Sequence, residues 1–265
     1  MIEEKIVDQK SYYYNIKKLN IAHYTGEISY YSKAPLRNVE KKVLSKLESS
    51  ANILDLGCGS GRFSIGAAQM GFNVTGVDIT PQSVEAAKQR AKQLNLVNVS
   101  FLSEDMINLP FKDKSFDYVF CPRFSINAVA TFSQRKKAIE EMLRVVKDKG
   151  IVFVESFNRF YLGKGIIFLL KNIIRDFWRY SFLLYCYLTE KPYTGLLLGD
   201  IIYKSNKVIG APEGYAHLPT IFELIRLVPK NAGFKFYSIP QIAQNRKFDF
   251  IKFFRYSIWI FITKE

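Results

Sequence analysis

The sequence has few of the residues that build covalent or metal-based frameworks. Its 265 residues include three cysteines, Cys58, Cys121 and Cys186, and two histidines, His23 and His217. Three scattered cysteines offer no disulfide framework, and without a CxxC pair little material remains for a zinc site, so we expect no metal. Such cysteine usage is typical of a reducing compartment, and we expect a cytoplasmic protein.

Long apolar runs are also absent. The most apolar stretch, residues 160–189, is interrupted by four charged side chains between Lys171 and Arg179, whereas a membrane-spanning helix needs about 20 largely apolar residues. The first ten residues are charged and lack an apolar core, so they do not resemble a secretory signal. Hydrophobic residues make up 48% and charged residues 23%, which excludes a disordered chain.

Acidic residues are scarce relative to basic ones. Lys and Arg number 38 against 24 Asp and Glu, a formal net charge of +14, and residues 151–265 carry 16 basic and 8 acidic side chains. A positive field attracts polyanions, anionic membrane surfaces or acidic small molecules. No basic run exceeds three residues, however, so a lysine-rich composition without any functional role explains the charge equally well.

From residue 52 onward, short apolar runs alternate with helical patterns. This alternation predicts an α/β fold, in which a parallel sheet is covered by helices on both faces. The expected strands are 53–56, 73–77, 99–102, 118–121 and 151–154, and the expected helices are 61–70, 81–95 and 133–146.

The segments before and after this core have weaker patterns. The tyrosine-rich residues 1–34 are predicted to be irregular or short-helical, and Pro35 suits the first turn of a helix over 35–49. Near the other end, Thr220 can cap a helix over 221–232 that Gly233 stops. The last two expected strands, 234–239 and 253–263, are joined too closely for a crossover helix and should pair antiparallel.

Residues 157–220 break the rhythm of the core. Lys164, Lys171, Arg175 and Arg179 recur at helical spacing, so they form one polar stripe on a helix whose other faces are apolar. We expect such a helix to bury most of its circumference. It would be an insertion packed over the ligand edge of the sheet, a dimer contact or a membrane-surface element.

The sharpest motif is ILDLGCGSGRF, residues 53–63, between the first expected strand and its helix. Gly57, Gly59 and Gly61 permit a tight turn and close approach of a ligand, which in such folds binds beyond the carboxyl ends of the strands. A GxGxxG dinucleotide fingerprint starting at Gly57 would require Gly or Ala at position 62, where this chain has Arg62.

Asp55 followed by GxGxG resembles the first motif of the class I S-adenosylmethionine-dependent methyltransferases. Asp78, 21 residues after Gly57, and the segments 103–106, 116–119 and 143–151 fall where that family has its later motifs. The resemblance covers residues 40–156. It implies a seven-stranded, mostly parallel sheet with an antiparallel last strand, plus an α-helical insertion after strand five. It also implies S-adenosylmethionine as cofactor and S-adenosylhomocysteine as product.

The resemblance divides the chain into four parts. They are a leader and helix that act as a lid (1–50), a cofactor-binding core (51–156), a helical insertion for the acceptor (157–220) and a closing helix with two strands (221–265).

The resemblance also assigns roles within the core. Asp55, or a carbonyl near Gly57, would accept the methionyl ammonium, the amides of the 59–62 turn would bind the carboxylate, and Asp78 would bind the ribose hydroxyls. An acidic side chain and a backbone amide after the third strand would hold the adenine. The complete expected cofactor set is Asp55, Gly57, Cys58, Gly59, Gly61, Asp78, Ile79, Asp105, Met106 and Cys121. Taken alone, Cys58 is a small turn residue and Cys121 a buried structural one.

The segment after the fourth strand excludes two subclasses. It reads Cys121-Pro122-Arg123-Phe124, not the (Asp/Asn)-Pro-Pro-(Tyr/Phe) of amino-methylating DNA and protein enzymes, and its Cys-Pro order is the reverse of the cytosine-C5 nucleophile motif. We therefore predict transfer to an oxygen or nitrogen atom of a small molecule. The expected acceptor or lid residues are Tyr24, Tyr31, Arg123 and Phe124, with His217 as general base and His23 as a weaker candidate.

Three alternatives remain open at this point. The basic surface favours a tRNA or other RNA methyltransferase. The apolar helix favours a peripheral enzyme that methylates a lipid-like precursor. A non-catalytic cofactor-binding partner is the third, although the intact glycine motif and Asp78 argue against it. Oligomeric state is not predicted.

Overall fold

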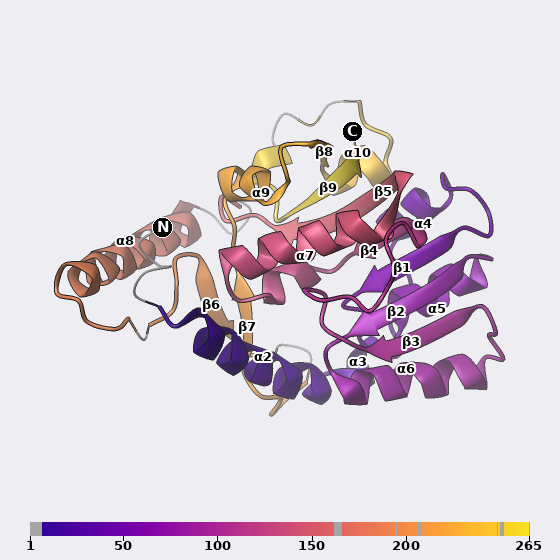
Figure 1. The fold of residues 1–265 in the computed structure, drawn as a ribbon, viewed down its shortest axis with the longest axis horizontal. Helices are drawn as coiled ribbons and strands as arrows, with labels where there is room; N and C mark the ends of the chain where they lie inside the picture. The colour runs from indigo at the N-terminus through magenta and orange to yellow at the C-terminus, as the bar shows by residue number, and fades with distance from the viewer. Residues whose placement is uncertain are drawn as a thin grey trace.

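The computed structural model describes residues 7–161, 166–193, 195–205, 208–247, 249 and 252–264. Its centre is a seven-stranded sheet in the order β3-β2-β1-β4-β5-β9-β8 (Figure 1). The strands are β1 (Asn52–Leu56), β2 (Asn73–Asp78), β3 (Val99–Ser103), β4 (Phe116–Cys121), β5 (Val146–Phe157), β8 (Ala232–Tyr237) and β9 (Ser257–Lys264). β9 is antiparallel to its neighbours β5 and β8, and the strands from β3 to β5 pair in parallel. The predicted fold class, including the antiparallel last strand, is confirmed.

Helices cover both faces of the sheet (Figure 1). On one face α4 (Asn38–Leu44), α5 (Arg62–Gln69) and α10 (Ile239–Ala243) pack on Phe120, Phe153 and Trp259, and Trp259 is fully buried. On the other face α7 (Phe132–Val145) and α9 (Ile221–Leu227) share a core with β4 and β9. α6 (Pro81–Gln93) lies against β2 and β3. The core is thus built from the apolar runs that the sequence predicted as strands.

The helix α9 begins where the sequence predicts and ends earlier. The Thr220 hydroxyl accepts a hydrogen bond from the Glu223 amide and caps α9, as predicted. The helix stops at Leu227 instead of residue 232, because Val228 precedes Pro229 and a residue before proline is driven into extended backbone. Gly233 then lies inside β8 and does not stop the helix.

The leader is more regular than expected. Residues Gln9–Gly26 form one helix, α2, whose first amides are capped by the Asp8 carboxylate, and a short helix, α3 (Ile28–Tyr31), follows. Asn20 on α2 accepts from the Tyr215 amide at 2.9 Å and donates to the Ala128 carbonyl at 3.0 Å. These contacts hold the leader against the rest of the molecule. A local sequence pattern cannot predict them, because the partners are far away in the chain.

The insertion contains strands as well as a helix, which corrects the purely helical prediction. After α8 (Ile166–Leu188), β6 (Asp200–Tyr203) and β7 (Gly214–His217) form a separate antiparallel ribbon. Each strand has only four residues, too few to give a strong alternating pattern. Single 3₁₀ turns, η1 (Ser125–Ala128) and η2 (Lys252–Phe254), precede α7 and β9. None of the described helices is both long and apolar enough to cross a membrane.

α8 extends from one end of the molecule (Figure 1), and its burial is the opposite of the expected one. Asn172 and Asp176, which lie beside the basic residues of the polar stripe, are buried, whereas Phe177 and Trp178 are 64% and 68% exposed. Lys164 of the predicted stripe lies outside the described residues. The expectation that this helix buries most of its circumference is therefore wrong, because its apolar side faces outward.

Candidate active site

The glycine turn after β1 has the backbone that only glycine adopts freely. Gly57, Gly59 and Gly61 have φ angles of 73°, 52° and 81°. A Cβ atom added to Gly57 would lie 2.2 Å from the Ser125 hydroxyl oxygen, so any side chain would push this turn away from the loop after β4. Gly61 caps the start of α5 in the left-handed region. The motif thus brings the helix start close to the strand ends, as predicted.

Asp78, at the end of β2, braces this turn. Its Oδ2 accepts a hydrogen bond from the Gly59 amide and its Oδ1 accepts one from the Thr80 amide, both at 2.8 Å. Burial raises the pKa of Asp78, and the two amide donors oppose that shift. Each carboxylate oxygen keeps a second lone pair for a ligand donor.

Asp55, on β1, is fully buried at the base of the turn. The Ser64 hydroxyl donates to its Oδ2 at 2.5 Å, while Oδ1 has no hydrogen-bond partner among the described residues. Burial raises the pKa of Asp55 to about 7 despite opposing contributions from Ser64 and Arg62. A buried acceptor without a donor is costly, so this oxygen is suited to a polar or cationic ligand group.

Asp105, just beyond β3, contacts the leader. Its Oδ2 accepts from the Tyr13 hydroxyl at 2.5 Å and from the Lys17 ammonium at 2.8 Å. Burial and this hydrogen bond raise the pKa of Tyr13. The sequence did not single out Tyr13 or Lys17, since their spacing of four on α2 is ordinary for any helix face.

These acids line one cavity of about 570 Å³, a size typical of ligand sites. Its wall combines the strand ends with side chains of α2, the loop after β4 and the β6–β7 ribbon. The predicted cofactor residues on this wall are Asp55, Gly57, Cys58, Gly59, Asp78, Ile79, Asp105 and Met106, and the predicted acceptor residues are Tyr24, Tyr31, Arg123 and Phe124. The leader is thus a wall of the cavity.

Two predicted cofactor residues lie elsewhere. Cys121 is fully buried in the apolar core with Leu56 and Val154. Gly61 lies against the side chains of Ala87 and Phe101, which belong to the apolar cluster between α6 and the sheet. Neither is among the described residues that line the cavity. In the structure Cys121 packs as a small apolar side chain, and Gly61 starts α5.

A strained turn at the end of β4 directs two side chains into the cavity. Arg123 and Phe124 both have left-handed backbone, with φ angles of 56° and 67°, which costs about 1–3 kcal/mol for each such residue. The buried Glu155 carboxylate holds the turn by accepting from the Arg123 amide at 2.8 Å. Arg37 in turn donates two hydrogen bonds to Glu155, at 2.9 and 2.5 Å.

Aromatic rings make up this end of the cavity. Phe124 stacks on Phe157 with ring centroids 3.8 Å apart, and Tyr256 meets both rings edge-on at 5.5 and 5.2 Å. The Arg123 guanidinium lies over the Tyr31 ring, 5.7 Å from its centroid. The cavity therefore has an acidic end at the strand termini and an aromatic end beyond β4.

Glu27 is a further carboxylate on the cavity wall, which the sequence analysis missed. It is 3% exposed and accepts a hydrogen bond from the Ser205 hydroxyl, and its Oε2 lies 3.5 Å from His23 Nε2. Burial opposes ionisation, but His23 and Ser205 outweigh it and lower the pKa of Glu27, while the pKa of His23 is raised. The i, i+4 spacing of His23 and Glu27 was the available signal.

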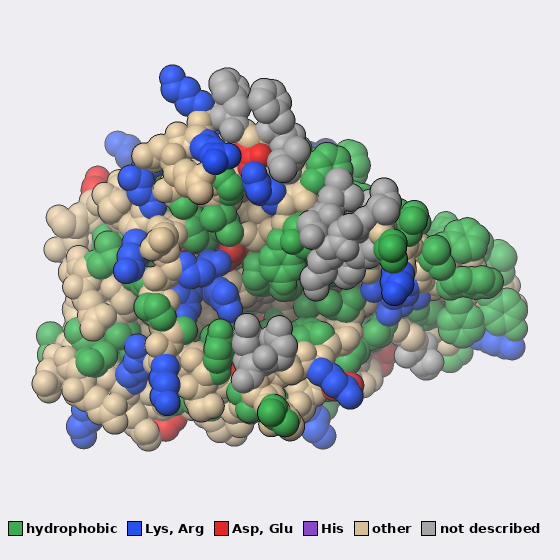
Figure 2. Space-filling view, turned by 180° about the vertical axis from the view of Figure 1, so that it is seen from behind, with side chains coloured by type: hydrophobic (Ala, Val, Ile, Leu, Met, Phe, Trp, Pro, Cys, Tyr) green, Lys and Arg blue, Asp and Glu red, His purple; other side chains and the backbone are tan. Residues whose placement is uncertain are grey.

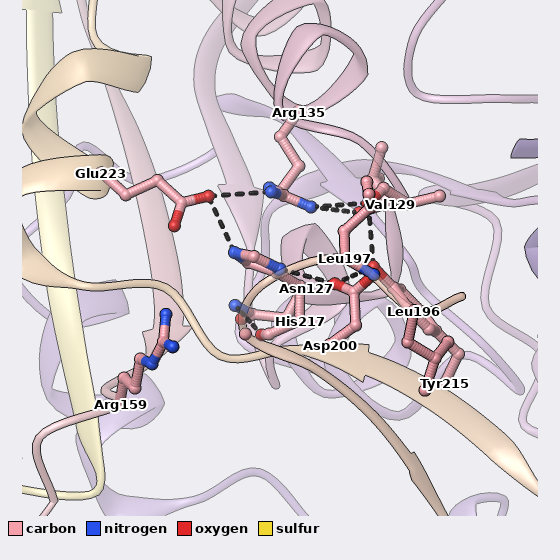
Figure 3. A network of polar contacts seen from close by, with 12 residues as sticks. Asn127, Val129, Arg135, Arg159, Leu196, Leu197, Asp200, Tyr215, His217 and Glu223 are labelled. Atoms are coloured by element: carbon pink, nitrogen blue, oxygen red, sulfur yellow. Dashed lines mark hydrogen bonds and ion pairs between the residues drawn. The ribbon is translucent and has the colours of Figure 1, made fainter. Parts of the chain in front are cut away.

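His217 lies in a different polar network (Figure 3). It is 3% exposed, with Nδ1 2.7 Å from Asp200 Oδ1 and Nε2 2.7 Å from Glu223 Oε1. Burial opposes ionisation of Glu223, but His217 and Arg135 outweigh it and lower its pKa to about 2. Both ring nitrogens face carboxylates, so the structure does not place His217 at the mouth of the site as the predicted base. The network instead joins β6, β7, α7 and α9.

The comparison with known proteins agrees with this geometry. Residues 47–178, about half of the chain, match a family described as "Methyltransferase domain". The chain belongs to the class I S-adenosylmethionine-dependent methyltransferases. The matched segment contains the glycine turn and the three aspartates at the strand ends.

The curated relatives that this chain resembles have names that point to different methyl acceptors. It is 39% identical over 119 residues to the 2-methyl-6-phytyl-1,4-hydroquinone methyltransferase of Synechocystis, covering 44% of this chain and 35% of that protein. It is 33% identical over 116 residues to the ubiquinone biosynthesis O-methyltransferase of Rickettsia akari, covering 44% and 42%. It is 29% identical over 139 residues to the human EEF1A lysine methyltransferase 2, covering 51% and 59%. The chain thus matches only about a third to three fifths of the length of these relatives.

Solved structures share the fold of this family member. A methyltransferase of Methanosarcina mazei superposes with a TM-score of 0.60 at 22% identity, covering 88% of this chain and 99% of that one. The CcbJ methyltransferase of Streptomyces caelestis gives 0.64 at 12% identity, covering 92% and 99%. At these identities the likeness shows the fold alone.

Proposed function

We propose that the protein transfers a methyl group from S-adenosylmethionine to an oxygen or nitrogen atom of a small molecule. The observation that carries the proposal is the single cavity in which the strand-end acids and an aromatic cluster share one wall. S-adenosylmethionine, when bound, supplies an electrophilic methyl group on a positively charged sulfonium. The names of the Synechocystis and Rickettsia relatives support a small acceptor.

The acidic end provides what the cofactor needs. The unpartnered Oδ1 of Asp55 would accept hydrogen bonds from the methionyl ammonium. The amides of Ser60 and Arg62 would donate to the methionyl carboxylate, since the Gly59 and Gly61 amides already bond to Asp78 and to the Cys58 carbonyl. The spare lone pairs of Asp78 would accept from ribose hydroxyls. Asp105 would bind near the adenine while anchoring α2 through Tyr13.

The aromatic end would hold the acceptor. Phe124, Phe157 and Tyr256 present ring faces and edges, which favour a flat, partly apolar molecule and exclude water. Aromatic faces also tolerate the positive charge of the sulfonium. Methyl transfer is an in-line displacement, so alignment of the two reactants by these walls supplies most of what the reaction requires.

Glu27 replaces His217 in our proposal as the group that takes the acceptor proton. It lies on the cavity wall, and His23 and Ser205 hold its carboxylate in the ionised form. For an acceptor that must lose a proton, Glu27→Gln should lower kcat and flatten its dependence on pH, with little change in the dissociation constant of S-adenosylmethionine. An unchanged pH profile would remove Glu27 from this role.

The proposal is tested by following the methyl group. The purified protein is incubated with methyl-labelled S-adenosylmethionine and undialysed cell extract, and the label is separated into low-mass, lipid, RNA and protein pools. Asp78→Ala serves as the inactive control. Label in the low-mass pool supports the proposal. Label in RNA that nuclease removes, or in protein, would overturn the small-molecule acceptor, and no transfer with a range of extracts would overturn the activity.

A further inference from the structure

The helix α8 buries Asn172, Asp176, Leu183 and Cys186 against the protein and turns a broad apolar side outward. Asp176 forms an ion pair with Arg159 and accepts from the Gly199 amide at 3.3 Å. Arg179 donates to the Asp200 carbonyl at 2.6 Å and to the Leu197 carbonyl at 3.3 Å. Asp176 and Arg179 therefore attach the helix to the rest of the protein, chiefly to Arg159 and the loop before β6, whereas Lys171 stays exposed.

The opposite side of α8 is apolar and uncovered. Ile173, Ile174, Phe177, Trp178, Phe182 and Leu188 are each between 49% and 70% exposed. Figure 2 shows hydrophobic side chains gathered over this end of the molecule. Soluble monomers rarely expose contiguous apolar surface of this kind, and such patches mark protein–protein or membrane contacts.

Charge distinguishes between the two kinds of partner. Lys171 on α8 and Lys191 just after it are exposed, and the chain carries +14 overall, of which +8 belongs to residues 151–265. In Figure 2 Lys and Arg side chains are more prominent than acidic ones across the whole view, and some of them lie beside the apolar end. A second copy would bring the same positive charges against each other, whereas an anionic lipid surface attracts them.

We propose that the exposed side of α8 docks on an anionic lipid bilayer, with the helix lying in the plane of the headgroups. Trp178 and Tyr180, 68% and 47% exposed, are residue types enriched at that depth, and the basic side chains flank them. Because Asp176 and Arg179 stay bound to the protein, only the opposite side of the helix enters the lipid. This docking goes beyond methyl transfer and is tested without any activity measurement.

The two tryptophans make the test specific. Trp178 is exposed on α8 and Trp259 is fully buried in the core, so only Trp178 can change its surroundings on docking. Wild-type protein should co-sediment with vesicles of phosphatidylcholine plus phosphatidylglycerol, and its tryptophan emission should shift to the blue. In Trp178→Phe the co-sedimentation should persist while the emission shift disappears. Vesicles of phosphatidylcholine alone should bind far less, and added salt should weaken binding to the anionic ones.

Variants of the exposed side decide the outcome. The double variant Phe177→Ser/Trp178→Ser should lose vesicle affinity by at least about tenfold, since two large apolar groups no longer leave water. The matched control is Phe222→Ser, which removes an aromatic side chain that is 75% exposed on α9. Binding of S-adenosylmethionine checks that each variant is folded. Failure to co-sediment with anionic vesicles, or equal binding of the double variant, overturns the proposal. So does a wild-type dimer that the double variant converts to monomer without vesicle binding.

Discussion

The hydroxyl of Tyr13 donates to the carboxylate of Asp105 across 2.5 Å, and this contact joins the leader helix to the end of the third strand. The two residues are 92 positions apart in the chain. Tyr13 and Asp105 both line the cavity, so this contact makes α2 part of the same site as the carboxyl ends of the strands. The stability of the leader and the affinity for ligand are therefore linked.

The first prediction concerns this contact. Tyr13→Phe should weaken S-adenosylmethionine binding about tenfold, because a hydrogen bond to a charged group contributes about 1.5–3 kcal/mol. Isothermal titration calorimetry measures the change. Tyr14→Phe is the control, since the neighbouring ring is 66% exposed. Equal affinities for the two variants would show that α2 does not support the ligand.

The second prediction concerns the carboxylate that braces the glycine turn. Asp78→Ala should reduce cofactor affinity by more than about tenfold, because the Gly59 and Thr80 amides lose their acceptor together with the ligand hydroxyls. Equilibrium binding with labelled cofactor measures it. Asp148→Ala removes an exposed carboxylate of a surface ion pair and should leave affinity unchanged. A similar affinity for both variants would contradict the assignment.

The third prediction concerns a buried ion pair behind the turn. Glu40 is fully buried and pairs with Arg62 at 2.6 Å and with Arg37 at 2.8 Å. Glu40→Ala should lower the free energy of unfolding by about 3–5 kcal/mol, because Arg62 would remain buried without its partner. Urea denaturation measures the loss. The exposed Glu48→Ala should change stability by less than about 0.5 kcal/mol.

The fourth prediction concerns pH. The pKa of His23 is raised above its ordinary value of 6.5, chiefly by Glu27 and the Pro212 carbonyl working against burial. A raised folded-state pKa contributes stability that is complete below pH 6.5 and is lost as pH rises through the folded value. Wild type should therefore exceed His23→Gln in stability by more at pH 6 than at pH 8. Chemical denaturation at both values checks this, and a difference that does not depend on pH would refute it.

The sequence predicted the parts of the site that depend on local chain geometry. The glycine turn and the strand-end acids Asp55, Asp78 and Asp105 follow from motif spacing, because parallel strands end on one edge of the sheet. The mostly parallel sheet with an antiparallel last strand, which the family resemblance implied, is also confirmed, whereas the order of the strands in the sheet was not predicted.

The remainder depends on contacts between distant segments. A histidine in a loop has the same local signature whether it faces a cavity or, like His217, lies between two buried carboxylates. The sequence of α8 shows that one side of the helix is polar and the others are apolar, but it does not show which side packs against the protein. Glu27 becomes relevant only when Ser205 and His23 are brought to it by the fold. The early end of α9, by contrast, has a local cause in the sequence, because Pro229 follows Val228.

The contacts of α2 also determine when the site is completed during synthesis. Asn20 accepts from an amide 195 residues later in the chain, and His23 reaches a carbonyl 189 residues later. A ribosome must therefore make most of the chain before the leader acquires the surface on which it rests. Until those later residues are made, the cavity lacks the wall that α2 provides.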